Sequence, residues 1–79
     1  MTQEFYNNLA KMIAYHRKLA GMNREQLARL AGVGKTVIFD IEHGKQTVRL
    51  DTLMKVLLVL NIKMEFNSPL MQSYREQLE

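Results

Sequence analysis

One short helix in the middle of the chain is predicted to point four chemically useful side chains outward. The helix begins near Lys35 and stops at Gly44, and Ile38 and Ile41 take its inward positions, at the spacing of an amphipathic helix. The outward residues are Lys35, Thr36, Phe39 and Asp40. A cation, a hydroxyl with its methyl group, an apolar ring and a carboxylate can all contact base edges in a DNA major groove.

Each of these four side chains has its own candidate contact. Lys35 could bind guanine O6 and N7 or a phosphate, and Thr36 could form a hydrogen bond or contact a thymine methyl group. Phe39 could pack on a thymine methyl group or fold partly into the core, and we favour the DNA contact. Asp40 would repel phosphates, so it either accepts from a cytosine amino group or caps the helix locally.

A second set of side chains could bind the phosphate backbone. Asn23 and Arg24 place backbone N–H groups and a cation at a predicted helix N-terminus, which favours anions. The remaining candidates lie at the end of the central helix and in the loop that follows it, and the full set is Asn23, Arg24, His43, Lys45, Gln46 and Arg49. Such contacts position a protein without reading sequence. Any single one could be a solvated side chain, so the prediction concerns the cluster.

Two short helices that meet at a glycine must position these residues. Asn23 is a suitable N-cap, and Gln26 stands where a capping box needs Glu or Gln. Gly32 follows the last apolar position of the first helix, where a left-handed residue is required. Two helices joined by a short glycine turn form a helix-turn-helix, whose second helix lies in the DNA major groove.

Several segments of the chain also carry a family pattern. They are Gln26-Leu27-Ala28, Ala31-Gly32-Val33, Ile41-Glu42-His43-Gly44-Lys45 and Leu50-Asp51-Thr52-Leu53. In these segments the chain resembles the XRE-type helix-turn-helix domains of lambdoid phage repressors and HipB-like antitoxins, over roughly Leu9 to Leu60. The resemblance implies an all-α, lambda-repressor-like bundle of four to five helices. The chain departs from it at Val48-Arg49, where the family commonly has Pro-Ser, a stiff residue followed by a good helix cap.

Arg17 is an unusual cation in the first predicted helix, which runs from about Gln3 to Ala20. It falls on the inward stripe of that helix, where a guanidinium without a partner costs several kcal/mol. The resemblance supplies the partner, because repressors of this family pair an arginine here with a glutamate at the position of Glu42. We therefore expect an Arg17–Glu42 ion pair, and the alternative is that Arg17 extends to solvent.

The last predicted core helix spans about Leu50 to Leu60, and it has more apolar surface than a small core needs. Met54 and Leu58 widen its apolar stripe, which more often marks an interface than a monomer surface. The alternative is that the C-terminal segment folds back and covers these two side chains.

Residues 62–67 change the hydrophobic period from 3.6 to two. Ile62, Met64 and Phe66 alternate with polar residues, which predicts a half-buried strand. A lone strand in a helical chain has unpaired backbone groups, so we expect it to pair with the same strand of a second subunit. HipB-like antitoxins have such an intersubunit strand. The predicted dimer interface is Met54, Leu58, Ile62, Met64 and Phe66, and a short helix that could also fray follows Ser68-Pro69.

The composition indicates one small domain with a polyanion-binding half. The chain has 79 residues, no cysteine and a net charge of +3. Residues 1–50 hold eight Lys and Arg against four Asp and Glu, a balance of +4, and residues 51–79 hold three against four, a balance of −1. No apolar run approaches a membrane span of about 18 residues. We expect a cytoplasmic, nucleoid-associated protein without metal or cofactor.

Catalysis is not expected from this sequence. His16 and His43 are isolated, without the spacing of metal ligands. Asp40 and Glu42 are two apart on one helix and point about 200° from each other, which is wrong for a shared acid–base site.

The combined prediction is a homodimeric DNA-binding repressor. Residues 1–60 would form the helix-turn-helix domain and residues 61–79 a dimerising strand and tail. The resemblance to HipB-like antitoxins implies that the protein represses its own operon at an inverted repeat and neutralises a HipA-like kinase toxin. The alternatives are a prophage-type repressor without a toxin partner and a protein-interaction module that does not bind DNA.

Overall fold

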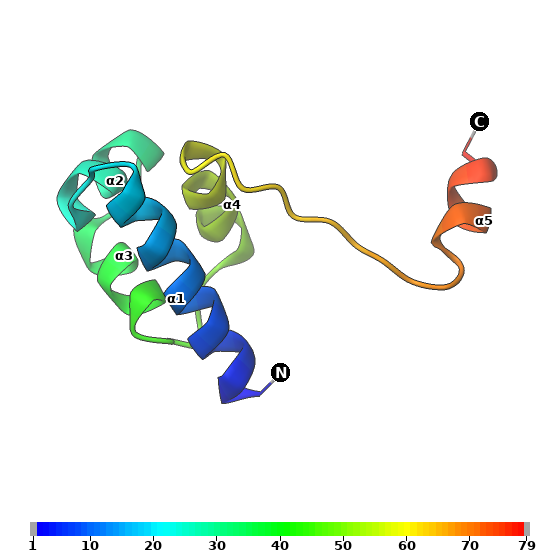
Figure 1. Cartoon of the computed structure of the whole chain (residues 1–79), viewed down its shortest axis with the longest axis horizontal. Coiled ribbons are helices and arrows are strands. Elements are labelled where there is room, and N and C mark those ends of the chain that lie inside the picture. The colour runs from blue at the N-terminus through cyan, green and yellow to red at the C-terminus, as the bar shows by residue number, and fades with distance from the viewer. Residues whose placement is uncertain (1, 79) are drawn as a thin grey trace.

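The computed structural model describes residues 2–78. The two predicted regions, 1–60 and 61–79, therefore each extend one residue beyond the described part of the chain. Four helices form a bundle, and a fifth stands apart at the end of an extended segment (Figure 1). The helices are α1 (Gln3–Leu19), α2 (Arg24–Ala31), α3 (Lys35–Glu42), α4 (Leu50–Val59) and α5 (Met71–Glu76). The predicted all-helical bundle is therefore confirmed.

The corner between α2 and α3 has the geometry that its sequence requires. The side chain of Asn23 accepts from the backbone N–H of Gln26 at 2.8 Å, and the Asn23 N–H donates to the Gln26 side chain, also at 2.8 Å. At the other end Gly32 adopts a left-handed φ of 70°, which an L side chain adopts only with strain. A capping box and a left-handed glycine thus fix both ends of α2.

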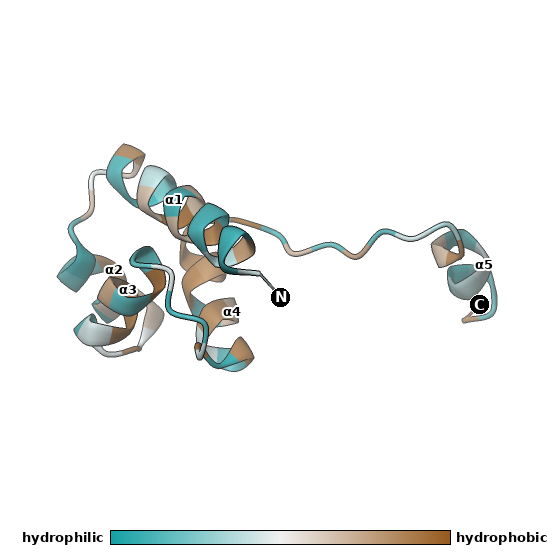
Figure 2. Cartoon of the chain, turned by 90° about the horizontal axis from the view of Figure 1, so that it is seen from below, coloured by the Kyte–Doolittle hydropathy of each residue, from teal (hydrophilic) through white to brown (hydrophobic). Residues whose placement is uncertain are grey.

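The core lies where α1, α2, α3 and α4 meet. Its largest fully buried side chains are Ile13, Leu27, Ile38 and Val56, one from each helix. Helix α4 is largely hydrophobic (Figure 2), and Leu53, Val56 and Leu57 are its buried residues. Since each helix contributes an inward stripe, the bundle fixes the orientation of α3 about its own axis.

Helix α4 begins at the predicted residue, Leu50, although no side chain caps it. Arg49 occupies the N-cap position, where the family pattern would place a serine. At the far end the helix gives way to Asn61, which adopts a left-handed φ of 58°. Asparagine tolerates this conformation better than most residues, and here it directs the chain out of the bundle.

The predicted strand is absent from the described chain, residues 2–78. Residues 62–67 lack any strand pairing, although the alternation of apolar and polar residues is visible along this segment (Figure 2). The strand was predicted to pair with a second subunit, and no segment of the described chain pairs with it. We name residues 61–70 the C-terminal arm. With the arm and α5 extended, the radius of gyration is 14.6 Å, against about 12 Å for a compact chain of this length.

Candidate DNA-binding surface

A buried carboxylate joins three helices beneath the surface that contains α3. Glu42 accepts two hydrogen bonds from Arg17 of α1, at 2.6 Å from Nε and 2.9 Å from Nη2. It also accepts one from Nε of Arg24, at the start of α2, at 3.0 Å. The Glu42 side chain is 1 % exposed. The expected Arg17–Glu42 ion pair is present, and Arg24 is a second partner that the sequence did not suggest.

The two arginines set the protonation of this group. Burial by itself would raise the pKa of Glu42, but the hydrogen bonds and charges of Arg17 and Arg24 outweigh burial and hold that pKa below its ordinary value. The hydrogen bonds that Arg17 donates to Glu42 likewise raise the pKa of Arg17. Arg17 also donates from Nη1 to the backbone oxygen of Met22, at 2.9 Å, so the buried guanidinium is paired and hydrogen-bonded.

The outward face of α3 has the predicted arrangement. Ile38 and Ile41 are buried, whereas Lys35 and Thr36 are exposed. The Lys35 ammonium lies 3.9 Å from the Glu25 carboxylate, and both side chains extend into solvent. Such an exposed pair contributes little to stability, so Lys35 can exchange this partner for a ligand.

Asp40 lies in the last turn of α3, and its side chain contacts the loop that follows the helix. Its carboxylate lies 3.3 Å from the Lys45 ammonium. Its backbone oxygen accepts from the backbone N–H groups of His43, at 3.2 Å, and Lys45, at 3.0 Å. The carboxylate contact is an ion pair with Lys45, and the two backbone hydrogen bonds do not involve the Asp40 side chain, so both of its predicted roles stay predictions.

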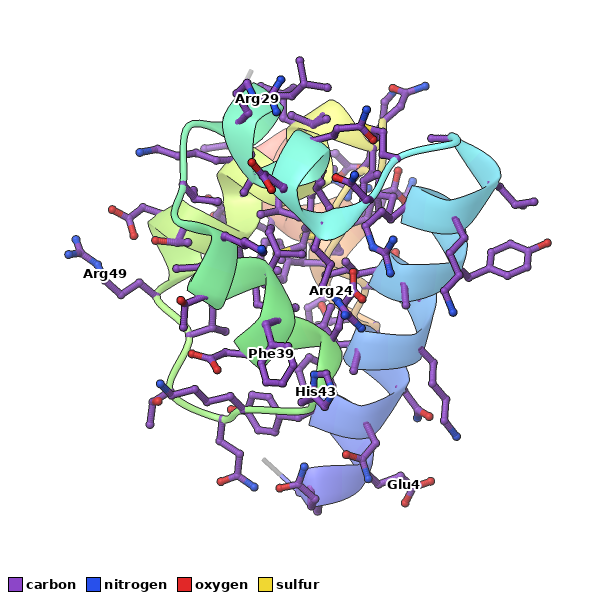
Figure 3. All side chains as sticks on the ribbon, turned by 90° about the vertical axis from the view of Figure 1, so that its left-hand side faces the viewer. Glu4, Arg24, Arg29, Phe39, His43 and Arg49 are labelled. Atoms are coloured by element: carbon purple, nitrogen blue, oxygen red, sulfur yellow. The ribbon has the colours of Figure 1, made fainter. Side chains whose placement is uncertain are left out.

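Phe39 is the centre of an aromatic cluster on the surface. The side chain is 48 % exposed, so it is not folded into the core. Its ring stacks on the His43 imidazole, with centroids 3.9 Å apart and planes 21° apart. The Arg24 guanidinium lies over the same ring, 5.5 Å from its centroid. These three side chains lie together on one face of the molecule (Figure 3).

A shallow cleft separates the N-terminus of α2 from α3. Its volume is about 350 Å³, and its lining residues are Arg17, Asn23, Arg24, Glu25, Lys35 and Phe39. Three of the six are cations and one is an anion. The cleft therefore combines the predicted phosphate-binding side with the predicted base-reading side.

The side chain of Gln3 in α1, which no sequence pattern singled out, holds the loop after α3. Gln3 donates from Nε2 to the Gly44 backbone oxygen, at 3.0 Å, and to Oδ1 of Asn7, at 2.9 Å. Gln46 donates to Oε1 of Gln3, at 2.7 Å. We call Gln3, Asn7, Gly44 and Gln46 the loop clasp. Polar residues near a helix start look like solvated side chains, and the contact spans about 40 residues of sequence, so no local signal marks it.

The last predicted phosphate ligand lies apart from the others. Arg49 pairs with Asp51, at 3.0 Å, and both side chains are exposed. In Figure 3 it is at the far edge of the face from Arg24 and His43. The structure thus groups Arg24, Phe39 and His43, and Arg49 lies apart from these three (Figure 3).

Of the five predicted interface residues, Met54, Leu58, Met64 and Phe66 are exposed, whereas Ile62 is half-buried against the core. Met54 is exposed and Leu58 is 81 % exposed, so the C-terminal segment does not fold back over them. Beside them, a hollow of about 440 Å³ is lined by Met54, Leu57, Leu58, Ile62, Lys63, Met64 and Glu65. Phe66, further along the arm, is 69 % exposed.

The comparisons with known proteins agree with this geometry. Residues 13–67 match the family described as helix-turn-helix. The chain is 29% identical over 62 residues to y4mF of Sinorhizobium fredii, an uncharacterized HTH-type transcriptional regulator, covering 78% of this chain and 82% of that protein. A solved structure described as MDT Protein superposes with a TM-score of 0.72 at 23% identity, covering 81% of this chain and 90% of that one. That structure shows the shared fold.

The chain therefore belongs to the helix-turn-helix family of DNA-binding domains, of the XRE type. Among the described residues no group of three or more His, Cys, Asp or Glu could hold a metal ion. None of the described helices has the length and apolar character needed to cross a membrane.

Proposed function

We propose that this protein is a sequence-specific DNA-binding transcriptional repressor. The observation that carries the proposal is the corner at Gly32, which sets α3 on the surface with Lys35 and Thr36 exposed and Ile38 and Ile41 buried. A helix presented in this way can enter a major groove. The family membership and the name of the S. fredii relative also support the proposal.

The residues take different parts in the proposed complex. Lys35 and Thr36 read base edges from the N-terminal half of α3. Arg24, His43, Lys45 and Gln46 bind phosphates on either side, with Asn23 fixing the start of α2. Asp40 and Arg49 have weaker claims to DNA, because the carboxylate of Asp40 would repel phosphates and Arg49 lies at the far edge of the face from Arg24 and His43 (Figure 3).

We further propose that the protein acts as a homodimer on an inverted repeat. Residues 1–60 form the DNA-binding domain, and residues 61–79 join the subunits. The exposed side chains of Met54, Leu58 and Phe66 support this proposal, because exposed large apolar surface marks an interaction site. Two-fold symmetry would let the unpaired segment 62–67 form a ladder with its copy.

The finer proposal is a HipB-like antitoxin of the cytoplasm and nucleoid that represses its own operon and neutralises a HipA-like kinase toxin. It rests on the sequence resemblance and on the exposed arm, which a protein partner could cover. A kinase-like reading frame beside this one, whose product co-purifies with it, would support the antitoxin role. A neighbourhood of lytic genes would favour a prophage-type repressor instead.

Selection from random duplex oligonucleotides tests the DNA-binding proposal directly. We expect an inverted repeat with half-sites about 34 Å apart, one helical turn, or a small multiple of that distance. Affinity for the selected duplex should fall steeply with salt, with a log–log slope of roughly −0.9 per phosphate neutralised. Lys35→Ala should lower affinity by about 1–3 kcal/mol. A flat salt response without sequence preference would favour the protein-interaction alternative.

A further inference from the structure

The cluster on α3 leaves Phe39 poorly placed to read a base by itself. Its ring is already stacked on His43 and is covered in part by the Arg24 guanidinium. A phenylalanine that packs on a thymine methyl group must offer a free face to that group. His43 and Arg24 reduce the ring surface open to such a contact to the part that is exposed, 48 % of the residue.

Arg24 and His43 each make one side-chain hydrogen bond within the chain, and each has further nitrogens beyond that bond. Arg24 gives Nε to Glu42, and within residues 2–78 its two terminal nitrogens have no hydrogen-bond or ion-pair partner. His43 places Nδ1 2.7 Å from the Phe39 backbone oxygen. Since a carbonyl only accepts, that nitrogen carries the proton, and Nε2 can donate to a phosphate oxygen only when the imidazole also carries its second proton.

We propose that Phe39 is a positioning residue, whose ring holds Arg24 and His43 in the orientation that binds DNA phosphates. This inference rests on the proposed DNA-binding function and deepens it. A guanidinium has five N–H donors in a planar fork that matches a phosphate. Anchored at Nε by a buried carboxylate and held against a ring, Arg24 keeps that fork ordered before DNA arrives, so less side-chain entropy is lost on binding.

The same arrangement explains why residue 39 is an aromatic residue. A leucine could contact a thymine methyl group as well as a phenylalanine does, but it has no π face for a cation or an imidazole. A cation over an aromatic ring contributes about 0.5–2 kcal/mol. Phe39→Leu therefore separates the two roles, and Phe39→Tyr, which keeps the ring, is the matched control.

The test measures binding of the full-length protein and these variants to the selected duplex, and to its single-base variants, across a salt series. Phe39→Leu should lose about threefold to thirtyfold in affinity on every duplex alike. It should also flatten the log–log salt slope by about one phosphate. Phe39→Tyr should restore both. Phe39 is half-exposed, and thermal unfolding followed by circular dichroism checks that its substitutions leave the fold intact.

A double-mutant cycle with Arg24→Gln gives an independent readout. Because Phe39 acts partly through Arg24, Phe39→Leu should cost clearly less affinity in the Arg24→Gln background than in the wild type, and the remaining loss is the part that acts through His43. Additive losses, or a Phe39→Leu effect confined to one base pair with an unchanged salt slope, would overturn the inference and make Phe39 a base reader. If the wild-type protein selects no duplex at all, it is the DNA-binding function that fails, and the two failures are distinguishable.

Discussion

Glu42 is the residue on which the geometry of the site depends most. It is buried, and its partners Arg17 and Arg24 come from two other helices. Replacing a buried ion pair with apolar residues can be neutral, but removing one partner leaves an unpaired buried charge. The pair is therefore better understood as a device that fixes how the three helices meet than as a large net source of stability.

Glu42→Gln should lower the free energy of unfolding by about 2–4 kcal/mol, because Arg17 remains buried without a counter-charge. Urea denaturation measures the change. Glu25→Gln is the matched control: its carboxylate faces Lys35 in solvent, and its loss should cost less than about 1 kcal/mol. Equal costs for the two variants would show that Glu42 has no special structural role.

The lowered pKa of Glu42 adds a pH dependence at the same residue. Its pKa is lower in the folded chain than in the unfolded one, so below the ordinary value of about 4.3 the unfolded chain binds more protons. The stabilisation is present above that value and is lost as the pH falls through the lowered pKa. The unfolding free energy of the wild type should therefore drop more steeply with acid than that of Glu42→Gln, and parallel curves would contradict this assignment.

Two glycines set the ends of the elements that present the site, and they do so for different reasons. Gly32 and Gly44 both have a positive φ, of 70° and 78°. A Cβ at Gly32 would meet nothing within 4 Å, whereas at Gly44 it would lie 2.7 Å from Oδ1 of Asn7 and 2.9 Å from Nε2 of Gln3. Gly44 is thus constrained by its conformation and by the loop clasp together.

Substituting alanine for each glycine separates these constraints. Gly32→Ala should cost about 1–2 kcal/mol for the left-handed conformation alone. Gly44→Ala should cost more, because the new Cβ also pushes Gln3 and Asn7 out of the clasp. Thermal unfolding gives both values. In a Gln3→Ala background, the extra loss of stability of Gly44→Ala relative to Gly32→Ala should shrink. An unchanged difference would show that the loop clasp is not its cause.

The elements were largely predictable from sequence, and the contacts between them were less so. The capping box of Asn23 and the glycine corner are local patterns, so α2 and α3 follow from a few residues each. The pairing of Arg17 with Glu42 came from family resemblance. The loop clasp of Gln3 and the stacking of Phe39 on His43 depend on how side chains meet after folding, and no spacing rule encodes them. The predicted strand needs the backbone of a second subunit to pair with, so its pairing stays a prediction.

In the whole molecule, the proposed DNA-binding face is on one side of the bundle, and the C-terminal arm extends away from the other side with exposed apolar side chains (Figure 1, Figure 3). Phe66 and Leu58 are among the most exposed large apolar side chains. Helix α5 has only six residues, and helices this short are marginal in water without tertiary packing. A second subunit would explain both features.

Phe66→Asp should convert the proposed dimer to monomer, because it would bury a charge between the paired arms. Sedimentation velocity over a concentration series measures this change. Asn67→Asp introduces the same charge at the adjacent residue, on the opposite side of an extended segment, and should leave the dimer intact. If Phe66→Asp still sediments as the wild type does, the subunits meet through another surface.

The left-handed turn at Asn61 joins the arm to α4 without an intervening linker. Subunits coupled through such arms would hold their two α3 helices at a separation set by rigid packing. Each base pair inserted between half-sites moves one by about 3.4 Å along the duplex and rotates it by roughly 35° about the axis, since a turn holds about 10–10.5 base pairs. The protein would then discriminate among operators by the phasing of their halves as well as by the bases within each half.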